Sequence, residues 1–97
     1  GFGAPAGSAD PPAAVAEAEG TVGPIWCLVN NSGVTIMKAA HKHTQEDYDA
    51  VMDTNLRAPF FLSQEVARRM IADGRPGRII NIASMHSHVE LKGGITY

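Results

Sequence analysis

The sequence predicts an α/β fold in which two parallel strands are joined by one long helical crossover. Two short apolar runs carry this prediction, residues 25–29 and 79–82, and both are bounded by glycine and polar turn residues. Residues 45–72 between them have helical periodicity. A strand, a helix and a strand in this order form a parallel βαβ unit, which is almost always right-handed.

The chain before the first strand is expected to hold one short helix. Residues 1–9 are rich in glycine, alanine and proline without an apolar period, so we expect irregular structure there. A helix is predicted from Asp10, whose carboxylate can accept from free backbone amides, while Pro11 suits the first helical position. Gly20 and the Gly23-Pro24 pair are expected to end it.

The first predicted strand passes into a polar turn, Asn30-Asn31-Ser32-Gly33, whose glycine permits close approach of the backbone. An asparagine at a strand tip offers two donors and one acceptor, so it can tie adjacent strands together or hold a ligand, and we expect both. Residues 34–43 then read as a solvated loop with a basic patch. No metal site is predicted there or elsewhere in the chain. The basic side chains are Lys38, His41, Lys42 and His43.

The long helix has a clear start, because Thr44 can cap it and Glu46 and Asp47 place negative charge in its first turn. Its sheet-facing side is predicted to run through Tyr48, Val51, Met52 and Leu56.

Asn55 adjoins that apolar row and is followed four residues later by Pro59. Proline has no N–H, and its ring crowds the carbonyl four residues back. The Asn55 carbonyl therefore needs another partner, for which an ordered water is the natural choice.

Beyond Pro59, Leu62, Val66 and Met70 are predicted to face the sheet, and Phe61 to open onto another surface. Arg68 and Arg69 are expected to be solvated. Residues 73–77 are interpreted as a turn and nothing more.

The second strand is predicted to be buried and to carry Ser84 at its C-terminal tip. Ligands of open parallel sheets bind at the carboxyl ends of the strands, so Ser84 would face a bound small molecule. Taken alone, such a serine more commonly begins a turn or caps a helix.

Four segments together resemble the short-chain dehydrogenase/reductase (SDR) family. Residues 28–33 resemble its Asn-Asn-Ala-Gly motif, and residues 53–56 resemble the segment that carries its helix asparagine. Residues 79–84 and Tyr97 resemble its serine strand and catalytic tyrosine. The order and spacing agree from about Pro12 to Tyr97. The family's Gly-rich phosphate turn and the lysine four residues beyond the tyrosine are absent from these 97 residues.

The resemblance implies a Rossmann-like doubly wound parallel sheet, of which residues 1–97 would be a partial NAD(P)-binding domain truncated at both ends. It also implies an NAD(P)-dependent oxidoreductase that interconverts a carbonyl and a secondary alcohol by hydride transfer. The cofactor would be NAD or NADP, and the parent enzyme is expected to be a homodimer or homotetramer. The 97 residues alone are expected to be inactive.

The resemblance assigns catalytic roles to three residues. Tyr97 would be the acid that handles the proton, Ser84 would hydrogen-bond the substrate oxygen, and Asn55 would support a water through which the proton leaves. Ser84 and Tyr97 would therefore also be the substrate-binding residues.

The cofactor would lie along Asn30, Ser32 and Gly33 with its adenosine half, and Tyr97 would contact it as well. Residues 85–96 would border the substrate pocket, where His86 and His88 are candidate contacts rather than metal ligands.

Composition excludes several classes of protein. Eight Lys and Arg against ten Asp and Glu give a net charge of −2 without a basic stripe, so there is no electrostatic footprint for nucleic acid. Cys27 is the single cysteine, which rules out a disulfide framework within the chain. No apolar run is long enough to span a membrane, and no signal peptide is visible, so we expect a cytoplasmic protein.

Two alternatives to a catalytic fragment stay open at this level. The same motifs fit a non-catalytic scaffold member of the fold, and an unrelated α/β binding module is a third possibility. The sequence leaves open the choice between NAD and NADP, because the residue that reads the ribose 2′ position follows an earlier strand. It also leaves open the identity of the substrate.

Overall fold

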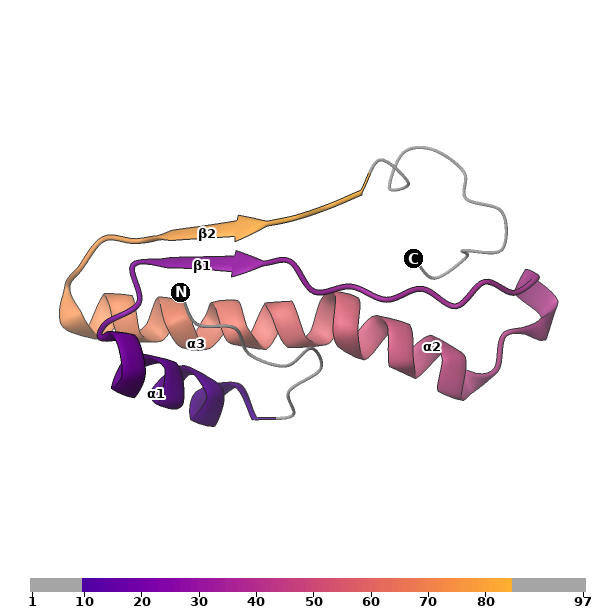
Figure 1. Cartoon of the computed structure of the whole chain (residues 1–97), viewed down its shortest axis with the longest axis horizontal. Coiled ribbons are helices and arrows are strands. Elements are labelled where there is room, and N and C mark those ends of the chain that lie inside the picture. The colour runs from indigo at the N-terminus through magenta and orange to yellow at the C-terminus, as the bar shows by residue number, and fades with distance from the viewer. Residues whose placement is uncertain (1–9, 85–97) are drawn as a thin grey trace.

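The computed structural model describes residues 10–84, and its core element is a pair of parallel strands (Figure 1). Strands β1 (Cys27–Asn30) and β2 (Arg78–Asn81) pair in register from Cys27 opposite Arg78 to Asn30 opposite Asn81. The other elements, in chain order, are helix α1 (Pro11–Val22), the 3₁₀ turn η1 (Ala40–Lys42), helix α2 (Gln45–Met52), the π turn η2 (Asp53–Arg57) and helix α3 (Ala58–Asp73). The predicted parallel pairing is therefore confirmed. The segment expected to be irregular, residues 1–9, lies outside the described residues.

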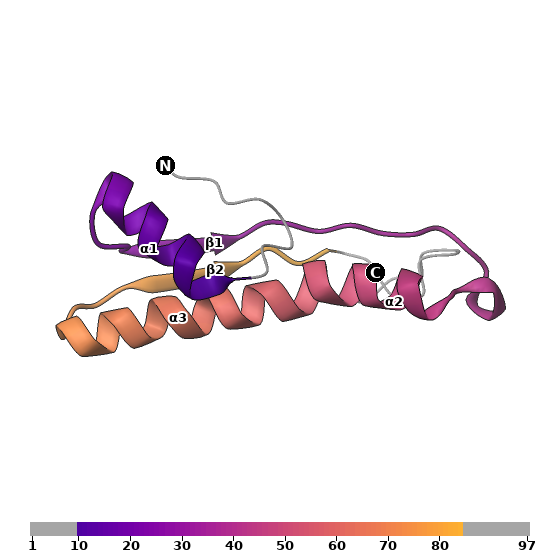
Figure 2. The same ribbon diagram turned by 90° about the horizontal axis from the view of Figure 1, so that it is seen from below.

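Helices α1 and α3 contact each other, and Figure 1 shows both of them below the strand pair. In the view from below, the strands run between the two helices in projection (Figure 2). Their contact is the apolar core, formed by Val15 of α1 with Val66 and Met70 of α3. Ile25, Leu28 and Leu62 pack against this cluster. The predicted sheet-facing side of α3 is confirmed, and burial of this side anchors the helix beneath the strands.

Helix α1 begins as predicted, since the Asp10 carboxylate accepts a hydrogen bond from the Ala13 amide at 3.2 Å. The prediction that Gly20 helps to end it was wrong, because the helix continues through Gly20 to Val22. A glycine inside a helix is tolerated at a modest cost. The stop is Gly23, which has a φ of 86° and donates its N–H to the Glu19 carbonyl at 2.9 Å.

The long crossover helix is interrupted by a π turn. Its start is confirmed: the Thr44 hydroxyl accepts from the Asp47 amide, and the Asp47 carboxylate accepts from the Thr44 amide, both at 3.1 Å. In the turn η2 the chain widens, so that the Ala58 amide donates to the Asp53 carbonyl five residues back. Pro59 follows at once and has no N–H to continue the ordinary ladder. The predicted long helical stretch is thus two α-helices joined through η2 into one rod (Figure 1).

Two burial predictions were wrong. All four residues of β2 are exposed, with Ile80 at 47%, because within residues 10–84 helices cover one face of the strand pair and no further strand flanks it. On α2, Tyr48 is exposed at 51%, and Leu56 in the π turn at 64%, while Val51 is fully buried. Figure 1 gives the reason, since α2 extends beyond the strand tips and has no described strand above it.

Candidate functional site

The candidate site lies at the carboxyl ends of the parallel strands β1 and β2, where both segments of the chain leave the sheet at the same edge. Pairing continues one step past the strands, with the Ile82 amide donating to the Asn30 carbonyl at 2.9 Å. Ser84 follows two residues later and is half-exposed. The polar turn after β1 and the serine after β2 are therefore at the same end of the pair, where parallel α/β sheets bind ligands.

Asn30 ties three elements together at this end. Its side-chain amide nitrogen donates to the Asn81 side-chain oxygen of β2 at 2.8 Å and to the Ser63 hydroxyl of α3 at 3.0 Å. The first contact confirms the prediction that a strand-tip asparagine joins adjacent strands. The second was not predicted, because nothing in the local pattern marks Ser63 as the partner of a residue 33 positions away.

Asn55 pairs with the chain just beyond the strand-tip turn. Its side-chain oxygen accepts from the Val34 amide, and its side-chain nitrogen donates to the Val34 carbonyl, each at 2.9 Å. A β-carbon placed on Gly33 would meet the same Asn55 oxygen at 3.6 Å, so Gly33 also lies beside it. The structure thus brings Asn55, from the π turn, against the turn that holds Ser32 and Gly33. These residues had been singled out separately from the sequence.

The remaining predicted site residues are only partly placed. Asn31, Ser32 and Gly33 are exposed, and Ser84 stands three residues beyond Asn81 on the neighbouring strand. Tyr97 lies outside the described residues, as do His86 and His88, so their predicted roles stay predictions.

The basic loop holds one ion pair rather than a cluster of free cations. Lys38 bonds Asp47 at 2.6 Å, and the His43 Nε2 atom lies 3.1 Å from the Lys38 carbonyl oxygen. The hydrogen bond from Lys38, followed by the one from the Thr44 amide, lowers the pKa of Asp47. Within residues 10–84 no group of three or more His, Cys, Asp or Glu side chains is arranged to hold a metal ion.

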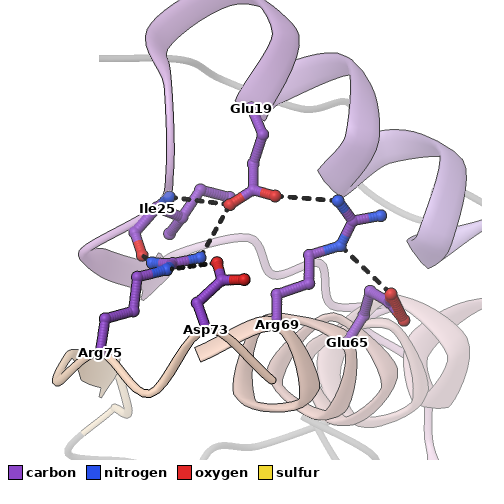
Figure 3. A network of polar contacts seen from close by, with 6 residues as sticks. All are labelled: Glu19, Ile25, Glu65, Arg69, Asp73 and Arg75. Atoms are coloured by element: carbon purple, nitrogen blue, oxygen red, sulfur yellow. Dashed lines mark hydrogen bonds and ion pairs between the residues drawn. The ribbon is translucent and has the colours of Figure 1, made fainter. Parts of the chain in front are cut away.

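A charged network closes the opposite end of the strand pair, where β1 begins (Figure 3). The Glu19 carboxylate of α1 accepts from the Ile25 amide at 2.9 Å, from Arg69 of α3 at 2.8 Å and from Arg75 at 3.0 Å. Arg75 also donates to the Ile25 carbonyl and bonds Asp73 at 2.9 Å, and Arg69 bonds Glu65 at 3.2 Å.

This network corrects two sequence interpretations. Arg69 is paired rather than merely solvated, and residues 73–77 do more than turn the chain, because Arg75 joins α1 to the entry of β1. The backbone hydrogen bond from Ile25, then the side-chain hydrogen bond from Arg69, lowers the pKa of Glu19 below its ordinary value of 4.5. The hydrogen bond to Glu19 raises the pKa of Arg69.

Comparison with known sequences decides the family. The sequence model described as short chain dehydrogenase matches residues 7–97. The chain belongs to this family. Membership excludes the unrelated α/β binding module considered from the sequence.

Three relatives illustrate the likeness. Carbonyl reductase [NADPH] 2 of Sus scrofa is 45% identical over 84 residues, which cover 87% of this chain and 34% of that protein. Gluconate 5-dehydrogenase of Gluconobacter oxydans (strain 621H) is 41% identical over 83 residues, covering 86% of this chain and 32% of that protein. The crystal structure of a gluconate 5-dehydrogenase from Burkholderia cenocepacia J2315, in complex with NADP and tartrate, superimposes with a TM-score of 0.80 at 39% identity. It covers 92% of this chain and 34% of that one.

These likenesses confirm the predicted Rossmann-like α/β fold. The chain spans about a third of the length of the curated relatives that it matches. Among the described helices, none is long and apolar enough to cross a membrane.

Proposed function

We propose that these residues form part of an NAD(P)-dependent oxidoreductase that interconverts a carbonyl and a secondary alcohol. The observation that carries the proposal is the double hydrogen bond from Asn55 to Val34, which joins the family's helix asparagine to its strand-tip turn. Family membership and the names of the relatives, which are reductases and dehydrogenases, support the same reaction class. Because the chain matches about a third of each relative, we further propose that it works within a longer enzyme.

The strand-tip turn suits a nicotinamide dinucleotide. Asn31, Ser32 and Gly33 are exposed. Among residues 10–84, a β-carbon on Gly33 would meet the Asn55 oxygen alone within 4 Å, which supports close approach of a flat ligand to this backbone. We assign Asn30, Ser32 and Gly33 to the adenosine half. When bound, the dinucleotide supplies or accepts the hydride. A relative named carbonyl reductase [NADPH] 2 and two similar solved structures that contain NADP make NADP(H) the first cofactor to test.

The chain's own residues would handle the oxygen and the proton. In the direction of reduction, Ser84 donates a hydrogen bond to the substrate oxygen, and Tyr97 gives its phenolic proton to that oxygen as the carbonyl becomes an alcohol. A free tyrosine titrates near pH ~10, so Tyr97 must be tuned by neighbouring positive charge to work near neutrality. Asn55 supports the water through which the proton is replaced.

The substrate is taken to be a small carbonyl compound or alcohol, and sugars and polyols are the first to try, given relatives named for gluconate and L-xylulose. Phe60 and Phe61 are 58% and 36% exposed on α3, which supports an assembly of like subunits. A homodimer or homotetramer and a cytoplasmic location stay predictions.

The test uses the complete enzyme that carries these residues, assayed with a panel of sugars, polyols and ketones and both nicotinamide cofactors. Tyr97→Phe keeps the ring and removes one oxygen, so turnover should fall by at least the ~10²-fold typical of losing an acid-base group, while cofactor binding survives. Ser84→Ala should also slow turnover. The double variant should lose much less than the product of the single losses, because both groups act on one oxygen.

Tyr48→Phe is the matched control, because Tyr48 is the other tyrosine of the chain and stands 51% exposed on α2. Its turnover should equal that of the unmodified enzyme. Near-normal turnover of Tyr97→Phe on the best substrate would overturn the catalytic assignment and favour a scaffold member of the fold.

A further inference from the structure

The helical rod formed by α2, η2 and α3 contacts both ends of the strand-tip turn, which here means residues 30–34. Ser63 of α3 accepts from the Asn30 side chain at 3.0 Å, and Asn55 of the π turn bonds both backbone groups of Val34 at 2.9 Å. The three residues between these anchors, 31–33, form none of the regular elements. The rod and the turn run side by side, because both ends of the turn are tied to it.

The distance between the two anchor residues along the rod agrees with the length of the turn that they hold. Asn55 and Ser63 are eight residues apart, which in a helix corresponds to a rise of roughly 12 Å. Asn30 and Val34 are four residues apart, which in an extended chain corresponds to roughly 13 Å. The rod therefore holds the turn near full extension, so that residues 31–33 have little freedom while both anchors are in place.

The anchor at Ser63, which is the near anchor because it holds the end of the turn next to β1, also fixes the Asn30 side chain. Its amide nitrogen donates to both Ser63 and Asn81, so both of its N–H groups have acceptors. Asn30 is half-buried, as is Ser63. Losing the Ser63 hydroxyl leaves one donor unpaired and frees the near end of the turn from α3.

We propose that Ser63 is a positioning residue for dinucleotide binding, acting through Asn30 to hold the backbone of residues 31–33 extended against the ligand. The inference rests on the proposed function, which places the adenosine half along this turn. Ser63 itself touches no reacting atom. Its removal should therefore weaken cofactor binding and leave the chemical step alone, since a ligand that must order its own site binds less tightly.

The experiment compares Ser63→Ala with Ser63→Thr in the complete enzyme. The Kd for NADP(H) is measured by calorimetry, kcat and KM by steady-state assay, and Tm by calorimetric scanning. Ser63→Ala should raise the dinucleotide Kd about three- to tenfold, with kcat at saturating cofactor within about twofold. Ser63→Thr keeps a hydroxyl acceptor and should restore binding. Gln64→Ala, the exposed neighbour on α3, is the matched control and should change neither quantity.

An unchanged Kd in Ser63→Ala would overturn the inference while leaving the proposed function in place. Absence of dinucleotide binding in the unmodified enzyme would instead overturn the proposed function. If Ser63→Ala fails to fold, Ser63→Cys is used, because its thiol fills similar space and accepts weakly. The same rise in Kd at an unchanged Tm supports the inference, and a normal Kd refutes it.

Discussion

The two ends of the β1–β2 pair are held by different chemistry. Where the strands begin, the Glu19 carboxylate of α1 forms ion pairs with the guanidinium groups of Arg69 in α3 and of Arg75 in the turn before β2 (Figure 3). Where the strands finish, neutral amides and hydroxyls make the contacts, with Asn30 and Asn55 as the main donors. Charged groups fasten the end at which the strands begin, and uncharged groups hold the backbone at the end where a charged cofactor is proposed to bind. Under the proposed function, ion pairs therefore stabilise the end of the strand pair that lies opposite the ligand site.

The largest effect on turnover is expected from a substitution of Asn55, at the end of the strand pair that is held by neutral groups. Asn55→Ala in the complete enzyme should lower kcat about 10²-fold, because it removes the side chain that fixes the Asn55 backbone against Val34, and the carbonyl of that backbone is proposed to hold the relay water. Stability should change little, since Val34 is 41% exposed and water can replace both lost hydrogen bonds. Steady-state kinetics and a thermal scan measure the two quantities, with Gln64→Ala as the control. An Asn55→Ala enzyme with normal turnover and a lowered Tm would mean that the neutral end serves only the fold.

Two glycines give a matched test of packing at the two ends. A β-carbon on Gly77, just before β2, would collide with the Met70 side chain and lie 2.9 Å from the Trp26 carbonyl oxygen. That oxygen cannot easily move, because it accepts from the Arg78 amide at 2.9 Å. Gly77→Ala should therefore cost about 1–3 kcal/mol of unfolding free energy.

Gly33→Ala at the other end should be tolerated by the fold, because its β-carbon would sit at an ordinary 3.6 Å from the Asn55 oxygen. It should nevertheless weaken NADP(H) binding, since the added methyl group would stand where the dinucleotide is proposed to approach the backbone. Urea unfolding and calorimetry measure both variants. Equal destabilisation by the two substitutions would remove the distinction between the ends.

The smallest expected effect is a pH dependence of the charged end. The folded-state pKa of Glu19 is lowered, first by the Ile25 amide and then by Arg69, so its stabilisation is complete above the ordinary value of 4.5. It is lost as the pH falls through the folded-state pKa. Glu19→Gln should cost about 1 kcal/mol at pH 7 in urea unfolding and progressively less in acid, with turnover unchanged at pH 7. A cost that stays constant down to low pH would show that the carboxylate charge is not what fastens this end.

Residues of the two ends could be predicted from the sequence only where a short local pattern marks them. Asn30, Gly33 and Asn55 stand in short motifs next to recognisable strand or helix boundaries, so the sequence indicated them before any contact was known. The partners of Asn30 and Glu19 lie up to 51 and 56 residues away, and no pattern at Ser63 or Arg75 marks them.

The fold was predictable to a similar extent. Hydrophobic runs and the cap at Thr44 gave the order of the elements and most of their bounds. Pro59 indicated a missing hydrogen bond, yet the response of the chain, a π turn at Asp53–Arg57, depends on how the rod relaxes around it. The isoleucines of β2 predicted a buried strand, whereas burial depends on what covers the strand, and the described residues cover one face.

The most direct test of the central claim, that the carboxyl end of the strand pair binds the cofactor, is hydrogen exchange on the complete enzyme with and without saturating NADP(H). Peptides covering residues 30–34 should gain protection on binding, because the ligand covers amides that the two anchors hold in place in both states. Peptides covering residues 73–77, at the charged end, should exchange at the same rate in both states. Protection confined to residues 73–77, or none at residues 30–34 when the cofactor is bound, would contradict the account.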